Sequence, residues 1–209
     1  METEIKLSPV EPNKAALVFG DELLSPFLGD VRRSDMESVY YKDQGRLLDN
    51  FNASLRLRSE NGEGICCLKI SSGVCGYAKI RREYEVRADN IAAGVASLCT
   101  IEDISQDIRD ILKASEFTAV CGCDFTRTEA DYVSPTLHFI LSYDIGEYRK
   151  GELSAPLGEI ELELVDGSAT ELSEIAGEII KKHGLPLCEI GKYQKAMSLE
   201  EPDGEDRVL

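Results

Sequence analysis

The sequence predicts a mainly β domain of the α+β class, in which charged side chains alternate with aliphatic ones along many strands. Strand-like runs outnumber helical patterns along the chain. Several runs repeat one kind of charge at every second position, as in SLRLR (54–58) and EIELE (159–163). The length of 209 residues fits one domain with its own core. We therefore expect a single domain over residues 1–198, followed by an acidic disordered tail, 199–209.

The order of the elements follows from the same patterns. The expected strands are 2–7, 38–41, 54–58, 64–70, 77–86, 125–132, 137–144 and 158–165. Glycines predict turns at Asn61-Gly62, at Gly73 and at Gly146. Helical spacing predicts helices over 13–24, 90–98, 101–114 and 169–183. The last helix has Ser168 as its expected N-cap and Gly184 just past its end.

Composition excludes several classes of function. Asp and Glu number 39 against 23 Lys and Arg, so the net charge is −16, and this field repels nucleic acid and anionic membranes. No run is apolar and long enough to cross a bilayer, and the first residues lack a signal-peptide pattern. The seven cysteines are odd in number and lack zinc-finger spacing. They indicate reduced thiols in a cytoplasmic protein.

The charged stripes are the chemical signal, because residues two apart on a strand share a face. The stripes are Glu2, Glu4 and Lys6; Arg56 and Arg58; Arg81, Glu83, Glu85 and Arg87; and Glu159, Glu161 and Glu163. A solvated sheet face explains any one stripe by itself. A run of carboxylates on one face is harder to explain this way, because like charges repel each other. A bound divalent cation would remove this repulsion. Paired guanidinium groups suit phosphate oxygens. Together the stripes predict a site for a metal-bound polyphosphate.

A colinear series of short motifs resembles the CYTH, or triphosphate tunnel metalloenzyme, family over nearly the whole chain. The motifs are ETEIK (2–6), VYYKD (39–43), SLRLR (54–58), LK (68–69), RREYE (81–85), FTR (125–127), YDIG (143–146), EIELE (159–163) and GK (191–192). Two positions depart from the family pattern. Lys42-Asp43-Gln44 replaces the usual Asp-Thr-Pro, and Lys195 stands where the last basic residue is usually Arg.

The resemblance implies an eight-stranded antiparallel β-barrel that forms a hydrophilic tunnel, with helices packed outside. The implied phosphate-binding residues are Lys6, Arg56, Arg58, Lys69, Arg81, Arg127, Lys192 and Lys195. The implied ligands of Mg²⁺ or Mn²⁺ are Glu2, Glu4, Asp144, Glu159, Glu161 and Glu163, with Glu83 and Glu85 as nearby support for metal or water. The implied catalytic residues are Glu4, Lys6, Arg56 and Arg58.

The function that this resemblance implies is metal-dependent hydrolysis of inorganic triphosphate, a small-molecule substrate, to diphosphate and phosphate. Thiamine triphosphatase, nucleoside triphosphatase and class IV-type adenylate cyclase activities of the same fold stay open, as does a non-catalytic polyphosphate-binding module. The absence of Trp removes the strongest stacking platform for an organic ring, which favours the inorganic substrate. The sequence leaves both a monomer and a homodimer open.

Overall fold

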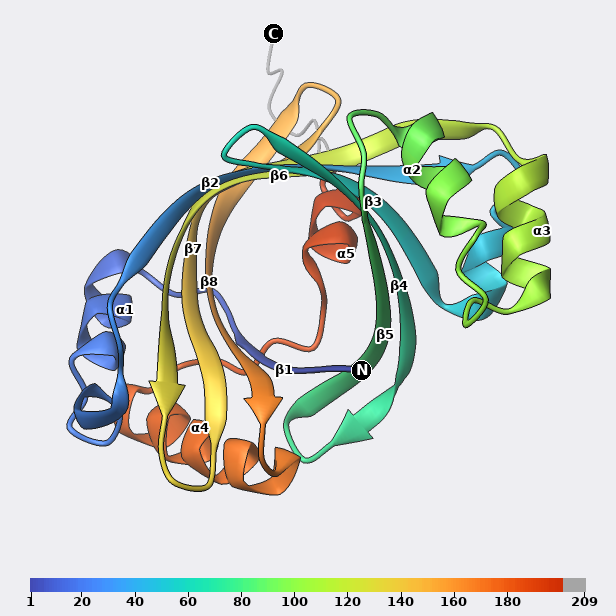
Figure 1. Ribbon diagram of the computed structural model, residues 1–209. Helices are drawn as coiled ribbons and strands as arrows, with labels where there is room; N and C mark the ends of the chain where they lie inside the picture. The colour runs from blue at the N-terminus through green and yellow to red at the C-terminus, as the bar shows by residue number, and fades with distance from the viewer. Residues whose placement is uncertain (201–209) are drawn as a thin grey trace, which may run out of the picture.

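The computed structural model describes residues 1–200. Within this part the chain forms eight strands, which are antiparallel to their neighbours and close into a barrel in the order β1-β5-β4-β3-β2-β6-β7-β8 (Figure 1). The strands are β1 (Glu2–Leu7), β2 (Arg32–Asp43), β3 (Ala53–Glu60), β4 (Glu63–Cys75), β5 (Ala78–Arg87), β6 (Phe117–Val133), β7 (His138–Lys150) and β8 (Leu153–Asp166). The predicted barrel is confirmed. The expected acidic tail lies outside the described residues, apart from Leu199 and Glu200.

Most strands are longer than the sequence predicts. Hydrogen bonds to a neighbouring strand extend each of them beyond the apolar segment that the sequence pattern marks. The second strand has 12 residues where the pattern predicts only 38–41. The turn predicted at Gly146 is wrong, since this residue lies inside β7 opposite Phe125. A Cβ at Gly146 would lie 2.0 Å from the Asp124 carbonyl oxygen, so close strand packing explains the glycine. The turn predicted at Gly73 is wrong too, because this residue lies inside β4 opposite Ile80, directly after a bulge.

Five α-helices occur in the described part of the chain. They are α1 (Pro12–Phe19), α2 (Ile91–Leu98), α3 (Gln106–Ala114), α4 (Ala169–His183) and α5 (Lys192–Met197), with 3₁₀ turns at Ser25–Phe27 and Leu47–Phe51. The bounds of α4 agree with the prediction. The Ser168 side chain caps its first turn, and Gly184 ends it with a φ of 61°.

Two predicted helices are too long. The helix predicted over 13–24 ends at Phe19, because the carboxylate of Asp21 accepts a hydrogen bond from the backbone N–H of Leu23 and forms a turn. The helix predicted over 101–114 begins at Gln106, because Ser105 at its N-cap has extended backbone angles.

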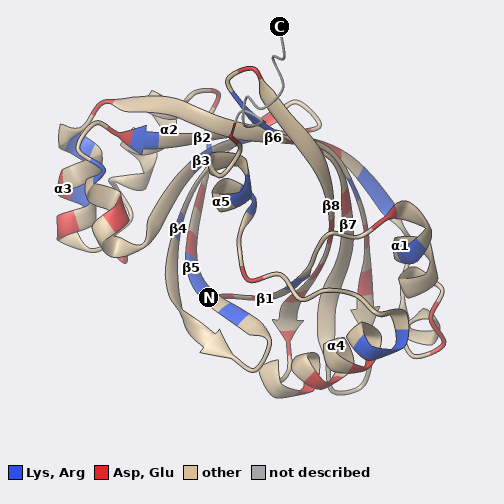
Figure 2. Ribbon diagram, turned by 180° about the vertical axis from the view of Figure 1, so that it is seen from behind, with Lys and Arg blue, Asp and Glu red and all other residues tan. Residues whose placement is uncertain are grey.

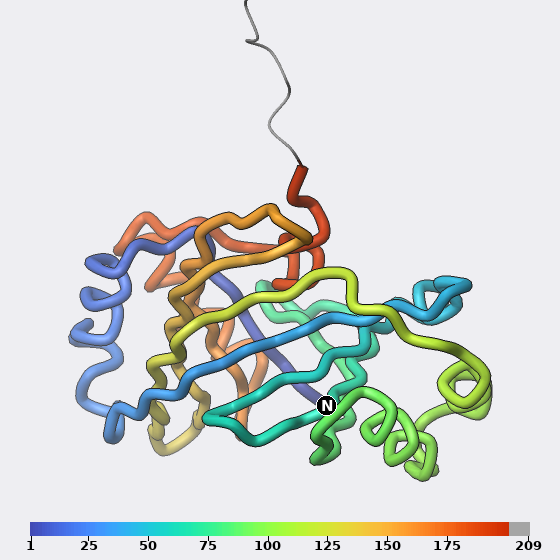
Figure 3. Tube along the Cα trace, turned by 90° about the horizontal axis from the view of Figure 1, so that it is seen from above, coloured from blue at the N-terminus to red at the C-terminus, as the bar shows by residue number. Residues whose placement is uncertain are grey.

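Most of the apolar core lies outside the barrel, between the sheet and the helices, and a smaller cluster lies inside, where Ala196 of α5 packs with residues such as Tyr40 and Phe125. One cluster joins α1 and α4 to the outer faces of β1, β7 and β8, and another joins α2 and α3 to those of β3 and β4. Charged residues of both signs recur along the strands around the ring (Figure 2), and many of them line the interior. Helix α5 packs against β6 and β7 at one end of the barrel (Figure 3). No helix in residues 1–200 is long and apolar enough to cross a membrane.

Candidate active site

The barrel encloses a polar cavity of about 750 Å³. Alternate residues of each strand point into it, so the charged stripes of the sequence meet across a common space. The predicted site residues that line the cavity are Glu2, Glu4, Lys6, Arg56, Arg58, Lys69, Arg81, Glu83, Glu85, Arg127, Glu161, Glu163 and Lys192. The other three predicted residues, Asp144, Glu159 and Lys195, do not line it.

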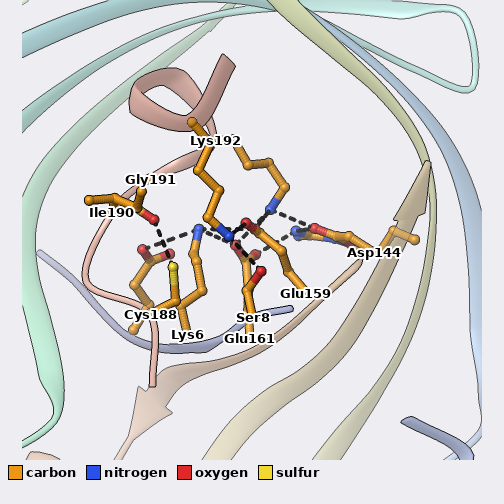
Figure 4. Close-up of polar contacts among 12 residues, drawn as sticks. Lys6, Ser8, Asp144, Glu159, Glu161, Cys188, Ile190, Gly191 and Lys192 are labelled. Carbon is orange, nitrogen blue, oxygen red and sulfur yellow. Dashed lines mark hydrogen bonds and ion pairs between the residues drawn. The ribbon is translucent and has the colours of Figure 1, made fainter. Parts of the chain in front are cut away.

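A cluster of ion pairs joins α5 to β8 at one end of the cavity. The Lys192 ammonium lies 2.8 Å from Asp144, 2.8 Å from Glu159 and 2.7 Å from Glu161 (Figure 4). The Lys6 ammonium lies 2.6 Å from Glu161 as well. Although burial opposes their charge, Lys192 and Lys6 hold the pKa values of both Glu159 and Glu161 below the usual range. These carboxylates are therefore ionised and already neutralised by protein cations.

Arg127 and Lys195 complete this cluster. The Arg127 guanidinium donates two hydrogen bonds to Asp144, at 2.7 and 2.8 Å, and one to Glu161 at 2.6 Å. The Lys195 ammonium lies 3.0 Å from Glu159. Both Asp144 and Glu159 are completely buried. The structure thus brings neither carboxylate, nor Lys195, to the cavity surface.

A second group of carboxylates faces the cavity with fewer partners. Glu4 and Glu163 lie directly opposite each other on neighbouring strands. Among residues 1–200, the buried Oε2 of Glu2 has no hydrogen-bond partner, and no ion pair within 4.0 Å involves Glu163. Burial, together with Glu2 and Glu161, raises the pKa of Glu163 to about 7. Burial and Glu4 raise the pKa of Glu2.

This second group fits a divalent cation. Crowded carboxylate oxygens with raised pKa values and an unpartnered buried oxygen are what a hard cation would neutralise. The charge of Glu4 is partly neutralised, because its Oε1 lies 2.6 Å from Arg81 Nη1. The geometry of this contact is not that of a hydrogen bond. Among the predicted ligands, Glu2, Glu4 and Glu163 therefore fit a metal ion by their charge and burial. In residues 1–200, Cys67, Glu83 and Glu85 are the group whose ligand atoms all lie within 4.8 Å of one another, so they could hold a metal ion as well.

The arginines of β3 form the opposite wall. Arg56 Nη2 lies 3.6 Å from Glu83 and 3.7 Å from Glu85, and Arg58 Nη2 lies 3.4 Å from Glu85. These long contacts leave the Nε and Nη2 of Arg56 and the Nε of Arg58 buried without a hydrogen-bond partner in the described residues. Unpaired buried donors are costly, and the oxygens of a bound anion would satisfy them.

Sequence reasoning missed several residues of the cavity wall. Lys79 lies on the inner face of β5, two residues before Arg81, where the same alternation would have found it. Tyr40, Phe125 and Tyr193 supply rings whose placement no motif predicts. The sequence predicts only that the Cys67 thiol is reduced, whereas its Sγ donates a hydrogen bond to Glu83 Oε1 at 2.8 Å beside the cavity.

The comparison with protein families agrees with this geometry. A model of the CYTH domain matches residues 1–191. The chain belongs to the CYTH domain family. The match includes every strand and ends just before α5, so this CYTH domain comprises the whole barrel.

Solved structures share the fold at low sequence identity. HpAC1 from Hippeastrum, a putative adenylyl cyclase with a dominant triphosphatase activity, is 21% identical, with a TM-score of 0.63 over 95% of this chain and 96% of its own. The PH1819 protein from Pyrococcus horikoshii is 19% identical, with a TM-score of 0.58 over 93% and 97%. A putative adenylate cyclase from Bacillus halodurans is 14% identical, with a TM-score of 0.56 over 92% and 95%. These likenesses establish the fold of this CYTH domain.

Proposed function

We propose that this CYTH protein is a cytoplasmic, metal-dependent hydrolase that converts inorganic triphosphate to diphosphate and phosphate. The observation that carries the proposal is the polar cavity in which guanidinium nitrogens without hydrogen-bond partners face carboxylates that lack full neutralisation. In such a site an anion would satisfy the donors of one wall, and a cation would neutralise the carboxylates of the other. A metal-bound polyphosphate supplies both.

The basic wall would bind the substrate. Arg56 and Arg58 have free donors for phosphate oxygens, and Lys69 and Arg81 extend the row of cations along the neighbouring strands. Their positive charge would align the chain of phosphates and stabilise charge that shifts toward the leaving group as the bond breaks. Water attacks the terminal phosphorus, and the bond to the bridging oxygen breaks to release phosphate and diphosphate.

The carboxylate wall would hold Mg²⁺ or Mn²⁺ through Glu2, Glu4 and Glu163. When bound, the ion neutralises phosphate oxygens and lowers the pKa of coordinated water. Glu83 and Glu85 orient the arginines through the contacts described above. Asp144, Glu159 and Glu161 position Lys6 and Lys192 instead of contacting substrate.

The aromatic residues of the cavity favour an inorganic substrate over one with a base or thiazole. Tyr40 and Tyr193 contact each other, with ring centroids 5.4 Å apart, and the Lys42 ammonium lies 5.0 Å from the Tyr193 centroid. The Phe125 ring has the Lys192 ammonium 5.2 Å from its centroid. Each ring already has an aromatic or cationic neighbour, which leaves less room for stacking on an organic group.

Phosphate release from triphosphate, thiamine triphosphate and ATP tests this function, with Mg²⁺, with Mn²⁺ and with excess EDTA. We expect triphosphate to have the highest kcat/KM, one phosphate per substrate, and no turnover in EDTA. Arg56→Ala and Arg58→Ala should each lower kcat/KM by about 30- to 1000-fold, equivalent to about 2 to 4 kcal/mol.

Arg87→Ala is the matched control, because this arginine is 84% exposed at the end of β5 and outside the cavity. It should keep wild-type kinetics. Undiminished turnover in chelator would contradict the metal mechanism. If Arg56→Ala and Arg58→Ala keep wild-type kinetics, the two arginines do not take part in the mechanism. A higher kcat/KM for ATP or thiamine triphosphate would mean that inorganic triphosphate is not the substrate.

A further inference from the structure

Lys79 is the cation of the cavity wall that no motif marks. It lies near the start of β5 and is half-buried, on the same inner face as Arg81 and directly opposite Glu4 of β1. The segment between α4 and α5 also lines the cavity, through Glu189 and Ile190, and its Cys188 lies near Lys79. The Lys79 side chain therefore lies within the barrel wall and not on its outer surface.

Lys79 also differs from its neighbours in having no carboxylate partner. Nine Lys and Arg residues line the cavity, and eight of them have a carboxylate oxygen within 4.0 Å. Among residues 1–200, no carboxylate lies that close to the Lys79 ammonium. The one opposite, Glu4, is in contact with Arg81 at 2.6 Å and with Lys6 at 3.9 Å.

Two other cations, Arg81 and Lys6, influence this ammonium. Burial, Arg81 and Lys6 together lower the pKa of Lys79, even though Glu4 opposes the change. A solvated surface lysine would turn away from two like charges, because its stem has several free torsions. An ammonium that has no ion-pair partner in residues 1–200 and lies on the inner face of a polar cavity is suited to bind an anion.

We propose that Lys79 binds a phosphate group of the substrate at the part of the cavity bordered by the α4–α5 segment. The inference rests on the proposed function and extends it: the ligand is a linear polyphosphate long enough to reach Lys79 from Arg56 and Arg58. Because Lys79 has no partner to give up, binding an anion there breaks no existing ion pair. Lys79 binds the substrate and the transition state alike, so it contributes to affinity more than to the rate of bond breaking.

The test compares Lys79→Gln, Lys79→Arg and Lys181→Gln with the wild type. Lys181 is an exposed residue of α4, so its replacement makes the same change of net charge outside the barrel. Calorimetry measures the Kd of sodium triphosphate in EDTA at several salt concentrations, and kinetics with Mg²⁺ measure KM and kcat. We expect Lys79→Gln to raise Kd and KM about tenfold, to leave kcat within about twofold, and to weaken the salt dependence. Lys79→Arg should restore most of the affinity, and Lys181→Gln should match the wild type.

The outcomes separate this inference from the proposed function. Wild-type Kd and KM in Lys79→Gln, while the wild type hydrolyses triphosphate, would overturn the role of Lys79 alone. Weaker triphosphate binding by Lys79→Gln, in a protein that hydrolyses none of the substrates, would support Lys79 and refute the hydrolase. A lowered Tm that Lys79→Arg does not rescue would make Lys79 a structural residue and overturn the inference. A wild type that does not bind triphosphate would overturn both.

Discussion

At the scale of single residues, identical side chains on one strand face meet opposite electrostatic environments. Glu161 and Glu163 are two residues apart on β8, and both line the cavity. Glu161 contacts Lys6, Arg127 and Lys192, each within 2.7 Å, whereas no cation within 4.0 Å pairs with Glu163 in residues 1–200. One carboxylate is a counter-ion for the protein itself, and the other is left for a ligand.

Their Gln variants should therefore change stability in opposite directions. The pKa of Glu163 is raised from its ordinary value of 4.5 to about 7 in the folded protein. Between these two pH values the folded state keeps the proton on Glu163, whereas the unfolded state has released it. Stability then falls as the pH rises from 4.5 to 7, and Glu163→Gln removes this loss. In EDTA we expect Glu163→Gln to raise the free energy of unfolding by about 1 to 3 kcal/mol at pH 8 and by almost nothing at pH 4. Urea titrations at both pH values measure this, and a gain independent of pH would contradict it.

Glu161→Gln is the matched variant on the same strand. From the sequence alone, this change removes a repelling charge and should leave the metal-free protein equally or more stable. The ion pairs reverse that expectation, because the pKa of Glu161 lies well below its usual value and its charge stabilises the fold above pH 4.5. We expect a loss on the order of 3 kcal/mol at pH 8. A stability equal to that of the wild type in the same titrations would show that the three cations do not depend on Glu161.

At the scale of elements, α5 is held by charge more than by helix propensity. It has six residues, too few to be stable alone, and Gly191 at its N-cap has no side chain to cap it. Gln194 accepts a hydrogen bond from the Gly191 N–H at 3.1 Å in its place. The buried ammonium of Lys192 connects the helix to β7 and β8, and Lys150 of β7 donates a hydrogen bond to the Met197 carbonyl oxygen at its end.

Lys192→Met should accordingly release α5. The change leaves Asp144, Glu159 and Glu161 short of one counter-ion in a buried site, and we expect a loss of about 3 to 5 kcal/mol in the free energy of unfolding. Amide hydrogen exchange over 192–197 should also become faster. Lys195→Met, which removes a cation that contacts only Glu159 of the cluster, should cost less. A stable Lys192→Met variant that binds triphosphate poorly would return Lys192 to the substrate-binding set that the sequence predicts.

At the scale of the whole molecule, the barrel differs from most small barrels in that many charged side chains point into its interior. Barrels with eight strands commonly fill their interior with side chains. Here two apolar clusters lie outside, against the helices, and a third, which includes Tyr40, Phe125 and Ala196, lies inside beside α5. The rest of the interior holds ion pairs, together with carboxylate oxygens and guanidinium nitrogens that lack hydrogen-bond partners in residues 1–200. The empty barrel is thus less stable than the same fold with its interior charges neutralised.

A complex of a metal ion with a polyphosphate, which supplies both charges, should therefore raise the Tm. At one hundred times Kd, binding stabilises the folded state by about 2.7 kcal/mol, or roughly 5 to 10 °C for a chain of this size. Differential scanning fluorimetry with Mg²⁺ and a slowly hydrolysed, imido-bridged triphosphate measures the shift. Arg56→Ala should lose most of it, and Arg87→Ala should keep it. An equal shift in both variants would place the ligand outside the barrel.

The sequence by itself determined the chemistry of the site and the class of fold. Alternation along a strand is a local property, so stripes such as SLRLR and EIELE already assign side chains to one face. The same holds for α4, whose bounds follow from Ser168 and Gly184. Family motifs then supplied the closure of the sheet, which periodicity does not contain.

Only the tertiary structure decided which charges neutralise each other. Carboxylates that look equivalent in sequence divide into those that Lys6, Arg127 and Lys192 neutralise and those that face the cavity with little compensation. The same pairing leaves Lys79 without a partner. An ion pair depends on the distance between strands that are far apart along the chain, and the Coulomb energy changes steeply with that distance and with burial. No local pattern encodes either quantity.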